Sequence, residues 1–278
     1  MVPEGRRMQP ARVYTVTSGK GGVGKTNIVL NLAIALTEAG QRVLIVDADL
    51  GLGNLDVLLG VQHTYTLGDV LAQRCTLKEA LVEGPKGVKI LPAESGVEEL
   101  TRLTTGQKIQ IFSLFHSLYE EANTILIDTA SGISSNVLFF SSFADRILLV
   151  ATPEPTSITD AYATMKVLSR TPGDHDFQLL INRAESEHQA REVYQTLARA
   201  AEHFLEITPG CMGFISKDPN LPRAVSRQRP LLEFDPDSPA CRDIRSLAGR
   251  LVATGHPVEG KEDRPRQIAP LSYHHGVC

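Results

Sequence analysis

The chain has 278 residues, of which 42% are hydrophobic and 22% are charged, and its formal net charge is −4. This composition suits one large α/β domain, and the slight negative charge does not support general binding to nucleic acid or to an anionic membrane. The longest apolar runs, such as 43–46 and 147–151, are too short to span a bilayer, and residues 1–12 contain no apolar signal-peptide segment. We therefore expect a soluble cytoplasmic protein.

Short β-branched runs alternate with longer helical patterns, which is typical of a doubly wound, mostly parallel sheet with helices on both faces. The expected strands are 13–17, 43–47, 88–91, 124–128, 146–151, 177–182 and 212–215. The expected helices are 25–39, one with apolar positions at 111, 112, 115 and 118, then 157–168, 187–201 and 241–251. We expect a short arm over 1–12, one domain over 13–253 and a flexible tail over 254–278.

The first expected strand is followed by the sequence GKGGVGKT at 19–26, a complete phosphate-binding loop. Its glycines let backbone N–H groups crowd around phosphate oxygens, and the next helix offers its positive end. Lys25 can reach the β- and γ-phosphates, and the Thr26 hydroxyl can ligate Mg²⁺. A glycine-rich turn without a ligand is the alternative. We predict that a nucleotide and Mg²⁺ bind here, with nucleotide contacts from Gly21, Gly22, Val23, Gly24, Lys25, Thr26 and Asn27.

Polar side chains end three other expected strands, where ligands of open parallel sheets bind. Asp47 and Asp49 follow the second strand and suggest metal handling or water orientation, the alternative being a helix cap and a turn acid. Asp128 ends an apolar run, as expected of an acid that holds Mg²⁺ through water, or it is a buried cap. Asn182 can pair with adenine through its amide, although asparagine is also an ordinary turn former.

A lysine at position 20, one residue after the first glycine, narrows the class of phosphate-binding loop. With this lysine, the chain resembles the MinD/ParA group of P-loop ATPases, which carry the deviant Walker A signature. The resemblance implies an ATPase in which two subunits face each other across two ATP molecules. Lys20 would cross to the partner's phosphates and supply positive charge as an arginine finger does. Activity would then require an ATP-dependent homodimer.

The same resemblance assigns roles to the acids and the loops after them. It implies that Asp49, in a D-x-D-x-G-x-x-N first switch, positions or activates the attacking water, and that Asp47 acts through the Mg²⁺ shell. It makes Asp128 a Walker B residue that holds Mg²⁺ through water. Asp128 also opens a second switch similar to D-[ST]-x-x-G-I, in which the Gly132 amide would sense the γ-phosphate. Loss of that phosphate would release both loops.

The resemblance extends to the adenine contacts and separates the chain from a related class. Asn182 and Arg183 are similar to the family's N-R adenine contact, and Asp218 lies in a stretch similar to I-P-x-D, with Ser216 in place of the proline. No C-x-x-C or Cys/His ligand spacing is present. The absence of such spacing argues against the iron–sulfur proteins of the superfamily, which need cysteines to bind their cluster. The four cysteines, which we expect to be reduced, are Cys75, Cys211, Cys241 and Cys278.

Within the group, residues 12–253 resemble the flagellar-number regulators called FleN, FlhG or YlxH. Local matches carry this likeness: KTN at 25–27, DADLGLGN at 47–54, DVLLG at 56–60, DTA with GI at 128–133, and EPTSITDAY at 154–162. The resemblance implies control of flagellar number or placement through a FleQ-like activator, an FlhF-like GTPase or switch-complex components.

The chain differs from these flagellar regulators in two segments, and the differences limit what the resemblance implies. Residues 1–12 have no activator helix of the D-Q-A-x-x-L-R kind, and residues 255–278 have no apolar stripe that would support peripheral membrane contact. The alternatives are a ParA-like ATPase for DNA or cargo partition and a MinD-like division-site regulator. DNA binding has no support from the charge balance.

Overall fold

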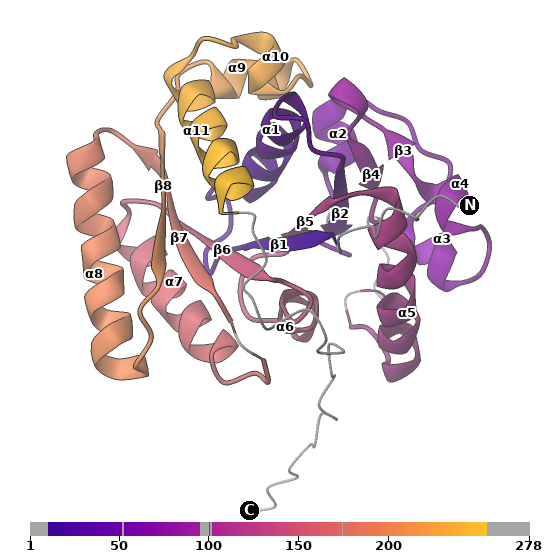
Figure 1. The fold of residues 1–278 in the computed structure, drawn as a ribbon, viewed down its shortest axis with the longest axis horizontal. Coiled ribbons are helices and arrows are strands. Elements are labelled where there is room, and N and C mark those ends of the chain that lie inside the picture. Colours follow the sequence, from indigo (N-terminus) through magenta and orange to yellow (C-terminus); the bar gives the residue numbers. More distant parts are fainter. Residues whose placement is uncertain (1–10, 52, 95–99, 101, 174, 255–278) are drawn as a thin grey trace, which may run out of the picture.

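The computed structural model describes residues 11–51, 53–94, 100, 102–173 and 175–254, and its centre is an eight-stranded sheet. The spatial order is β3-β4-β2-β5-β1-β6-β7-β8, and every neighbouring pair is parallel except β3 with β4 (Figure 1). The strands are β1 (Arg12–Thr17), β2 (Val43–Ala48), β3 (Val82–Glu83), β4 (Lys89–Leu91), β5 (Thr124–Thr129), β6 (Arg146–Ala151), β7 (Phe177–Ala184) and β8 (Gly210–Ser216). Because the chain winds outward from β1 in both directions, the switch point of the sheet lies at the carboxyl end of β1.

Helices cover both faces of the sheet. The helical segments are α1 (Lys25–Glu38), α2 (Leu55–Leu59), α3 (Leu67–Leu71), α4 (Leu77–Ala80), η1 (Pro85–Gly87), α5 (Thr105–Glu121), α6 (Ser135–Ser141), α7 (Pro155–Leu168), α8 (Glu187–Leu205), α9 (Leu221–Ser226), α10 (Leu231–Phe234) and α11 (Pro239–Ala253). Helices α1 and α11 pack on one face, and α5, α6, α7 and α8 lie on the other (Figure 1).

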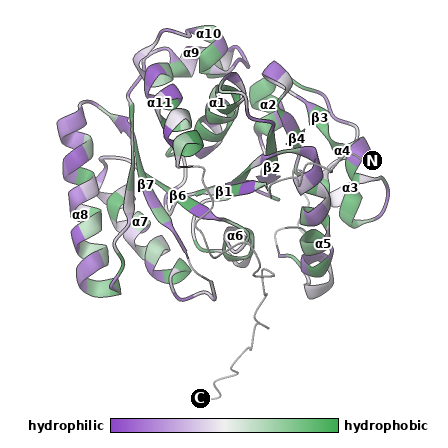
Figure 2. Ribbon diagram, in the orientation of Figure 1, coloured by the Kyte–Doolittle hydropathy of each residue, from purple (hydrophilic) through white to green (hydrophobic). Residues whose placement is uncertain are grey.

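Successive side chains along each strand point to opposite faces of the sheet, and each face therefore has a hydrophobic core of its own. On β1, Tyr14 and Val16 belong to the core beneath α1 and α11, whereas Val13 belongs to the core beneath α5. Such alternation follows from the period of two along a strand. In the outer helix α8, hydrophobic and hydrophilic residues separate onto two sides (Figure 2), and the buried side carries Ala190, Val193, Leu197 and Ala201. Their spacing of three or four residues is that of one helix face.

Reciprocal capping fixes where three of the helices begin. Thr66, Thr76 and Thr104 each accept a hydrogen bond at the side-chain oxygen from the backbone N–H three residues later. The side-chain oxygen at that later position accepts one from the threonine N–H. Each box satisfies two backbone donors that a helix start leaves unpaired. This explains how helices as short as α3 and α4 are defined.

The predicted doubly wound α/β fold is confirmed, and each of the seven expected strands is present within one or two residues of its expected bounds. The expectation missed β3, whose two residues are too few to show a period, and the short helices between β2 and β4. Nearly all of the predicted arm (1–12) and tail (254–278) lies outside the described residues. No helix in the described ranges has both the length and the apolar character needed to cross a membrane.

Close packing of α7 against the loop after β1 sets the position of that loop. A Cβ added at Gly19 would overlap the backbone carbonyl of Asp160 in α7, so only glycine allows this approach. At Gly21, two residues later, an added Cβ would meet only Ser131 Oγ, at 3.4 Å, which is an ordinary contact. The first glycine of the loop is therefore a packing residue.

Replacing Gly19 by alanine should lower the free energy of unfolding of the nucleotide-free protein by about 1–3 kcal/mol, because α7 or the loop must move. The matched variant Gly21→Ala should change it little, or raise it by at most about 1 kcal/mol through the unfolded chain. Urea unfolding followed by circular dichroism measures both. Equal stability of the two variants would contradict the packing role of Gly19.

Candidate nucleotide-binding site

The loop between β1 and α1 has the backbone geometry that phosphate binding requires. Gly22 and Gly24 have φ of 75° and 99°, in the left-handed region that favours glycine. At Gly24 a Cβ would also lie 2.7 Å from Asn182 Nδ2. No side chain caps the start of α1. Its first N–H groups are therefore available to an anion at the positive end of the helix dipole.

Lys25 is the first residue of α1, and its ammonium group is buried beside the loop. It donates a hydrogen bond to Ser18 Oγ at 3.1 Å, and Ser18 Oγ in turn donates to the Lys20 carbonyl at 2.8 Å. Burial lowers the pKa of Lys25, and the charges of Asp128 and Asp49 oppose this effect. These interactions hold the lysine at the mouth of the loop, close to two carboxylates.

Asp47 and Asp128 occupy paired positions on the neighbouring strands β2 and β5, and both are 2% exposed. Burial, followed by the charge of Asp128, raises the pKa of Asp47 well above its usual range. Burial raises the pKa of Asp128 to about 7, although a hydrogen bond from the Thr26 hydroxyl and the charge of Lys25 act in the opposite direction. The backbone N–H of Asp49 donates to Asp47 Oδ1 at 3.1 Å. The predicted residues Lys25, Thr26, Asp47, Asp49 and Asp128 are thus brought together.

This cluster suits a magnesium ion that also binds phosphate. Asp128 Oδ1 is buried and has no hydrogen-bond partner in the described part of the chain, which is costly unless a cation or water approaches it. Within the same residues, no group of three or more His, Cys, Asp or Glu side chains forms a complete metal site. Mg²⁺ commonly takes one or two protein ligands and completes its shell with water and phosphate oxygens. Hydroxyl and carboxylate oxygens are the donors it prefers.

Gly132, after β5, is hydrogen-bonded to the residue that follows β1. Its N–H donates to the Ser18 carbonyl at 2.8 Å, and its φ is 90°. Thr129, at the end of β5, donates through its hydroxyl to the carbonyl of Val16 at 3.1 Å. The loop after β5 is therefore tied directly to the loop after β1. If the Gly132 amide is to bind a γ-phosphate, it must first give up its hydrogen bond to the Ser18 carbonyl.

A cavity of about 500 Å³ adjoins the loop at the ends of β7 and β8, a size that accommodates a small-molecule ligand. Asn182, Arg183 and Asp218, which were predicted as base contacts, line it, and so does Asn27, which was predicted as a nucleotide contact of the loop. Its apolar wall was not predicted, because the residues come from separate elements and share no motif. That wall is formed by Ile28, Ile215, Leu221, Pro222, Leu231 and Ile244.

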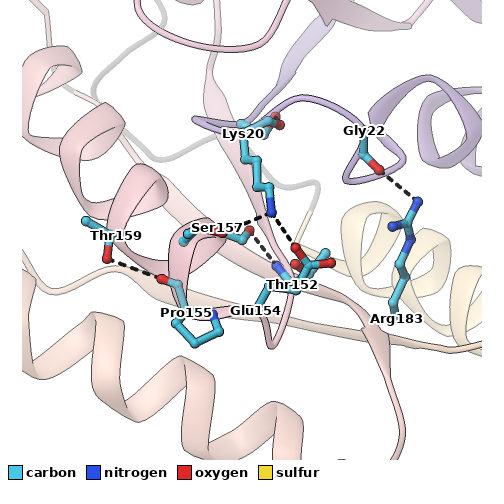
Figure 3. A network of polar contacts seen from close by, with 10 residues as sticks. Lys20, Gly22, Thr152, Glu154, Pro155, Ser157, Thr159 and Arg183 are labelled. Atoms are coloured by element: carbon cyan, nitrogen blue, oxygen red, sulfur yellow. Dashed lines mark hydrogen bonds and ion pairs between the residues drawn. The ribbon is translucent and has the colours of Figure 1, made fainter.

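The predicted base-contact residues also hold the structure together. Asn182 donates from Nδ2 to the Val23 carbonyl at 2.7 Å and accepts the Arg183 N–H at Oδ1. Arg183 has φ of 59°, and its guanidinium donates to the Gly22 carbonyl at 2.7 Å (Figure 3). A non-glycine residue in the left-handed region is uncommon and is often associated with function. These two side chains join the end of β7 to the phosphate-binding loop.

Asp218 is fixed at the opposite side of the cavity. Its Oδ1 accepts the Asn220 N–H at 2.9 Å, and its Oδ2 accepts the Ala240 N–H, near the start of α11, at 3.4 Å. The carboxylate thus links the loop after β8 to α11 while it lines the cavity.

Lys20 is not part of the cluster around Lys25. Its ammonium group forms an ion pair with Glu154 and donates to Thr156 Oγ1 at 2.9 Å, both at the start of α7 (Figure 3). The roles of Ser18, Glu154 and Thr156 were missed. For Glu154 a signal existed, because it follows an expected strand and precedes an expected helix at the ligand-binding edge of the sheet.

Comparisons with known proteins agree on one family. The family model described as cellulose biosynthesis protein BcsQ matches residues 12–252. The antiactivator FleN of Pseudomonas aeruginosa is 41% identical over 244 residues, which cover 88% of this chain and 87% of FleN. The flagellum site-determining protein YlxH of Helicobacter pylori is 32% identical over 87% of this chain and 82% of its own length.

A solved structure shares both the fold and recognisable sequence. The septum site-determining protein MinD of Pyrococcus horikoshii OT3, complexed with Mg-ADP, is 26% identical, with a TM-score of 0.73 over 87% of this chain and 96% of MinD. Taken with the family model and the relatives, this likeness is sufficient for assignment. The chain belongs to the BcsQ/MinD/ParA family of P-loop ATPases.

Proposed function

We propose that this ATPase is a slow, Mg²⁺-dependent switch that dimerises when it binds ATP and, as a dimer, regulates the number or placement of flagella. The observation that carries the chemical part is the phosphate-binding loop with buried Lys25, whose charge acts on Asp128. Oδ1 of this acid has no hydrogen-bond partner among the residues that the structure describes. The similarity to the antiactivator FleN and to YlxH supports the biological part.

In the proposed site, the loop N–H groups and Lys25 bind the β- and γ-phosphates. Thr26 and Asp128 would hold Mg²⁺, and Asp47 would act through its water shell. That a nucleotide and Mg²⁺ bind is supported by the relative from P. horikoshii, whose structure is complexed with Mg-ADP. When bound, the ion would neutralise charge that develops on the transferring phosphoryl group. Because ionised Asp47 and Asp128 repel each other and lose hydration, Lys25 and the cation are needed to stabilise both as carboxylates.

Asp49 is the candidate for orienting the attacking water. Its backbone is anchored to Asp47, and its carboxylate is half-buried and interacts electrostatically with Lys25 and Asp128. In the base cavity, the Asn182 amide, with Arg183 and Asp218 nearby, would contact adenine. Gly132 would exchange its bond to Ser18 for one to the γ-phosphate, so the loop after β5 would differ between the ATP and ADP states.

Lys20 would reach the nucleotide of a second subunit, as in the deviant Walker A group, so the ATP-bound form would be a homodimer. The partner of that dimer would be a flagellar regulatory protein: a FleQ-like activator, an FlhF-like GTPase or a switch-complex component. A surface that differs between the ATP and ADP states is what such regulation needs.

Two substitutions separate binding from hydrolysis. Lys25→Ala should abolish productive ATP binding, whereas Asp49→Ala should bind ATP, form a dimer and release phosphate at least about a hundredfold more slowly. Phosphate release and light scattering after gel filtration measure the two properties. Asp237→Ala, at an exposed aspartate outside the site, should behave as wild type. Wild-type turnover by Asp49→Ala, or a monomer with bound ATP, would contradict the cycle.

The buried acid predicts a pH effect on the nucleotide-free protein. The folded pKa of Asp128 is about 7 against 3.8 in the reference state, so the folded form holds the proton more tightly. The resulting stability is complete below about pH 4 and is lost as pH rises through 7. Between pH 5 and pH 8 this contribution falls by at most about 3 kcal/mol, because the unfolded carboxyl is already ionised at pH 5. Asp128→Asn should therefore stabilise the protein, relative to wild type, by that much more at pH 8 than at pH 5.

Urea unfolding of wild type and Asp128→Asn at both pH values tests this effect, with Asp237→Asn as the control. The same stability difference at pH 5 and pH 8 would show that Asp128 is ionised throughout. Addition of Mg²⁺ and ADP should reverse the order at pH 8, because the ligand would bind the carboxylate and not the amide.

Electron microscopy of cells tests the biological role. Deletion of the gene should change the number or placement of flagella, and the Asp49→Ala gene should fail to restore the normal pattern where the wild-type gene restores it. Unchanged flagella with misplaced septa would favour a division-site regulator. Unchanged flagella with lost DNA or mislocated cargo would favour a partition ATPase.

A further inference from the structure

We infer that Gln228 is a positioning residue that ties the wall of the base cavity to α2, the helix that follows the segment carrying Asp49. A base that fills the cavity thereby orders this segment and raises the rate of hydrolysis. The inference rests on the proposed function, in which the cavity receives adenine and Asp49 orients the attacking water.

Gln228 lies in the turn between α9 and α10, and its side chain contacts the end of α2. Its Nε2 donates a hydrogen bond to the Val57 carbonyl at 2.9 Å, although the two residues are 171 positions apart. Val57 lies in the last turn of α2, where carbonyl groups are satisfied by partners outside the helix. At Gly60, the C-cap of α2, an added Cβ would lie 3.8 Å from Cβ and Oε1 of Gln228. The glutamine therefore both packs against the end of α2 and caps it.

The backbone of the turn directs this side chain at α2. Gln228 has φ of 51°, in the left-handed region that non-glycine residues rarely adopt unless surrounding contacts enforce it. Its N–H donates to the Val225 carbonyl at 2.9 Å, and the N–H of Arg229 donates to the Ala224 carbonyl at 3.1 Å. These two bonds fix the turn from which the glutamine side chain extends.

The same segment forms part of the wall of the base cavity. Leu221 and Pro222 from α9 and Leu231 from α10 line it. In Figure 1, α9 and α10 lie at the top of the molecule, above α1. Helix α10 is fixed to α1, because buried Asn31 accepts the N–H of Leu232 at 2.9 Å. Leu231 is buried, whereas Leu221 is half-buried and Pro222 is exposed. A base that covers the wall therefore buries new apolar surface mainly on α9.

The start of α2 lies close to the acids of the site. Gly53, two residues before the helix begins, approaches Asp47 so closely that an added Cβ would lie 2.9 Å from Asp47 Oδ2. Helix α2 has only five residues, and a helix of this length has little stability of its own. Its position depends on the burial of Leu55 and Leu59 and on contacts at its end. Ordering of α2 is therefore passed to the segment that carries Asp49.

The hydrogen bond from Gln228 is exposed, so water competes for it and its loss should leave the fold intact. Gln228→Met keeps the length of the side chain but has no donor. This variant should hydrolyse ATP with a kcat about two- to tenfold lower. The KM for ATP should change little, because Gln228 is not among the described residues that line the cavity.

Hydrogen exchange of the full chain, followed by mass spectrometry, tests the tie without turnover. ADP and inorganic pyrophosphate both suit the phosphate-binding loop, but only ADP carries a base. In wild type, ADP should slow amide exchange over residues 53–61 about two- to tenfold more than pyrophosphate does. In Gln228→Met the two ligands should have equal effects over 53–61, while ADP still protects residues 19–27.

The matched control is Gln73→Met, because Gln73 is also an exposed glutamine in the left-handed region, with φ of 57°. It should behave as wild type in both measurements. Gln228→Lys keeps a donor and should retain the difference between ADP and pyrophosphate. Gln228→Asn tolerates the left-handed backbone but is too short to reach the Val57 carbonyl, and it should lose the difference even if Gln228→Met disturbs the turn.

Loss of the difference in the variants without a donor, with a lower kcat at an unchanged KM, would support the tie. If wild type shows no difference between ADP and pyrophosphate over 53–61, or if Gln228→Met and Gln228→Asn keep it, the tie is wrong and the proposed function stands. If millimolar ADP protects neither 19–27 nor 53–61 in wild type, the nucleotide site is contradicted and the tie falls with it.

Discussion

The site depends on two acids that lie at paired positions on neighbouring strands and are buried from solvent. Parallel pairing of β2 with β5 aligns Asp47 with Asp128, and both side chains lose nearly all contact with water. Two such carboxylates cannot both ionise without positive charge nearby. Lys25 and the Thr26 hydroxyl provide part of the compensation from the start of α1. The remaining deficit, seen at Asp128 Oδ1, makes this edge of the sheet receptive to a cation that arrives with phosphate.

Ser18 connects this electrostatic centre to the segment expected to change shape. Its hydroxyl accepts from Lys25, and its carbonyl accepts from the Gly132 amide. One residue immediately after β1 therefore contacts both the phosphate-binding lysine and the loop after β5. Movement of Lys25 towards a phosphate would remove one of the two contacts. Such an arrangement explains how a small displacement at the phosphates can be transmitted to a surface loop.

The sequence predicted the structure best where a motif or an apolar run and a functional residue lie within one short stretch. The 19–26 motif gave the loop, and apolar runs ending in Asp47, Asp128 and Asn182 gave strands whose carboxyl ends converge. It was weakest where a property arises between distant segments. The contact of Lys20 with Glu154 joins residues 134 positions apart. The place of Glu154 after an expected strand could mark it as functional, but nothing local to either residue identifies the other as its partner.

The cavity wall and the antiparallel β3 were missed for related reasons. The wall is formed by one or two apolar residues from each of α1, β8, α9, α10 and α11. Any one of them reads as ordinary core in the sequence. Strand β3 has two residues, and it is defined by pairing with β4 and not by a pattern of its own.

The bonds from Asn182 and Arg183 to the loop carbonyls of Val23 and Gly22 have a thermodynamic consequence. The wall that would receive the base and the loop that would receive the phosphates are one mechanical unit. A ligand that occupies only the base cavity or only the phosphate-binding loop therefore still has to order the other part, or disturb it. The affinities of adenosine and of inorganic triphosphate should therefore not sum to that of ATP, because the intact nucleotide meets the ordering cost of the shared unit once.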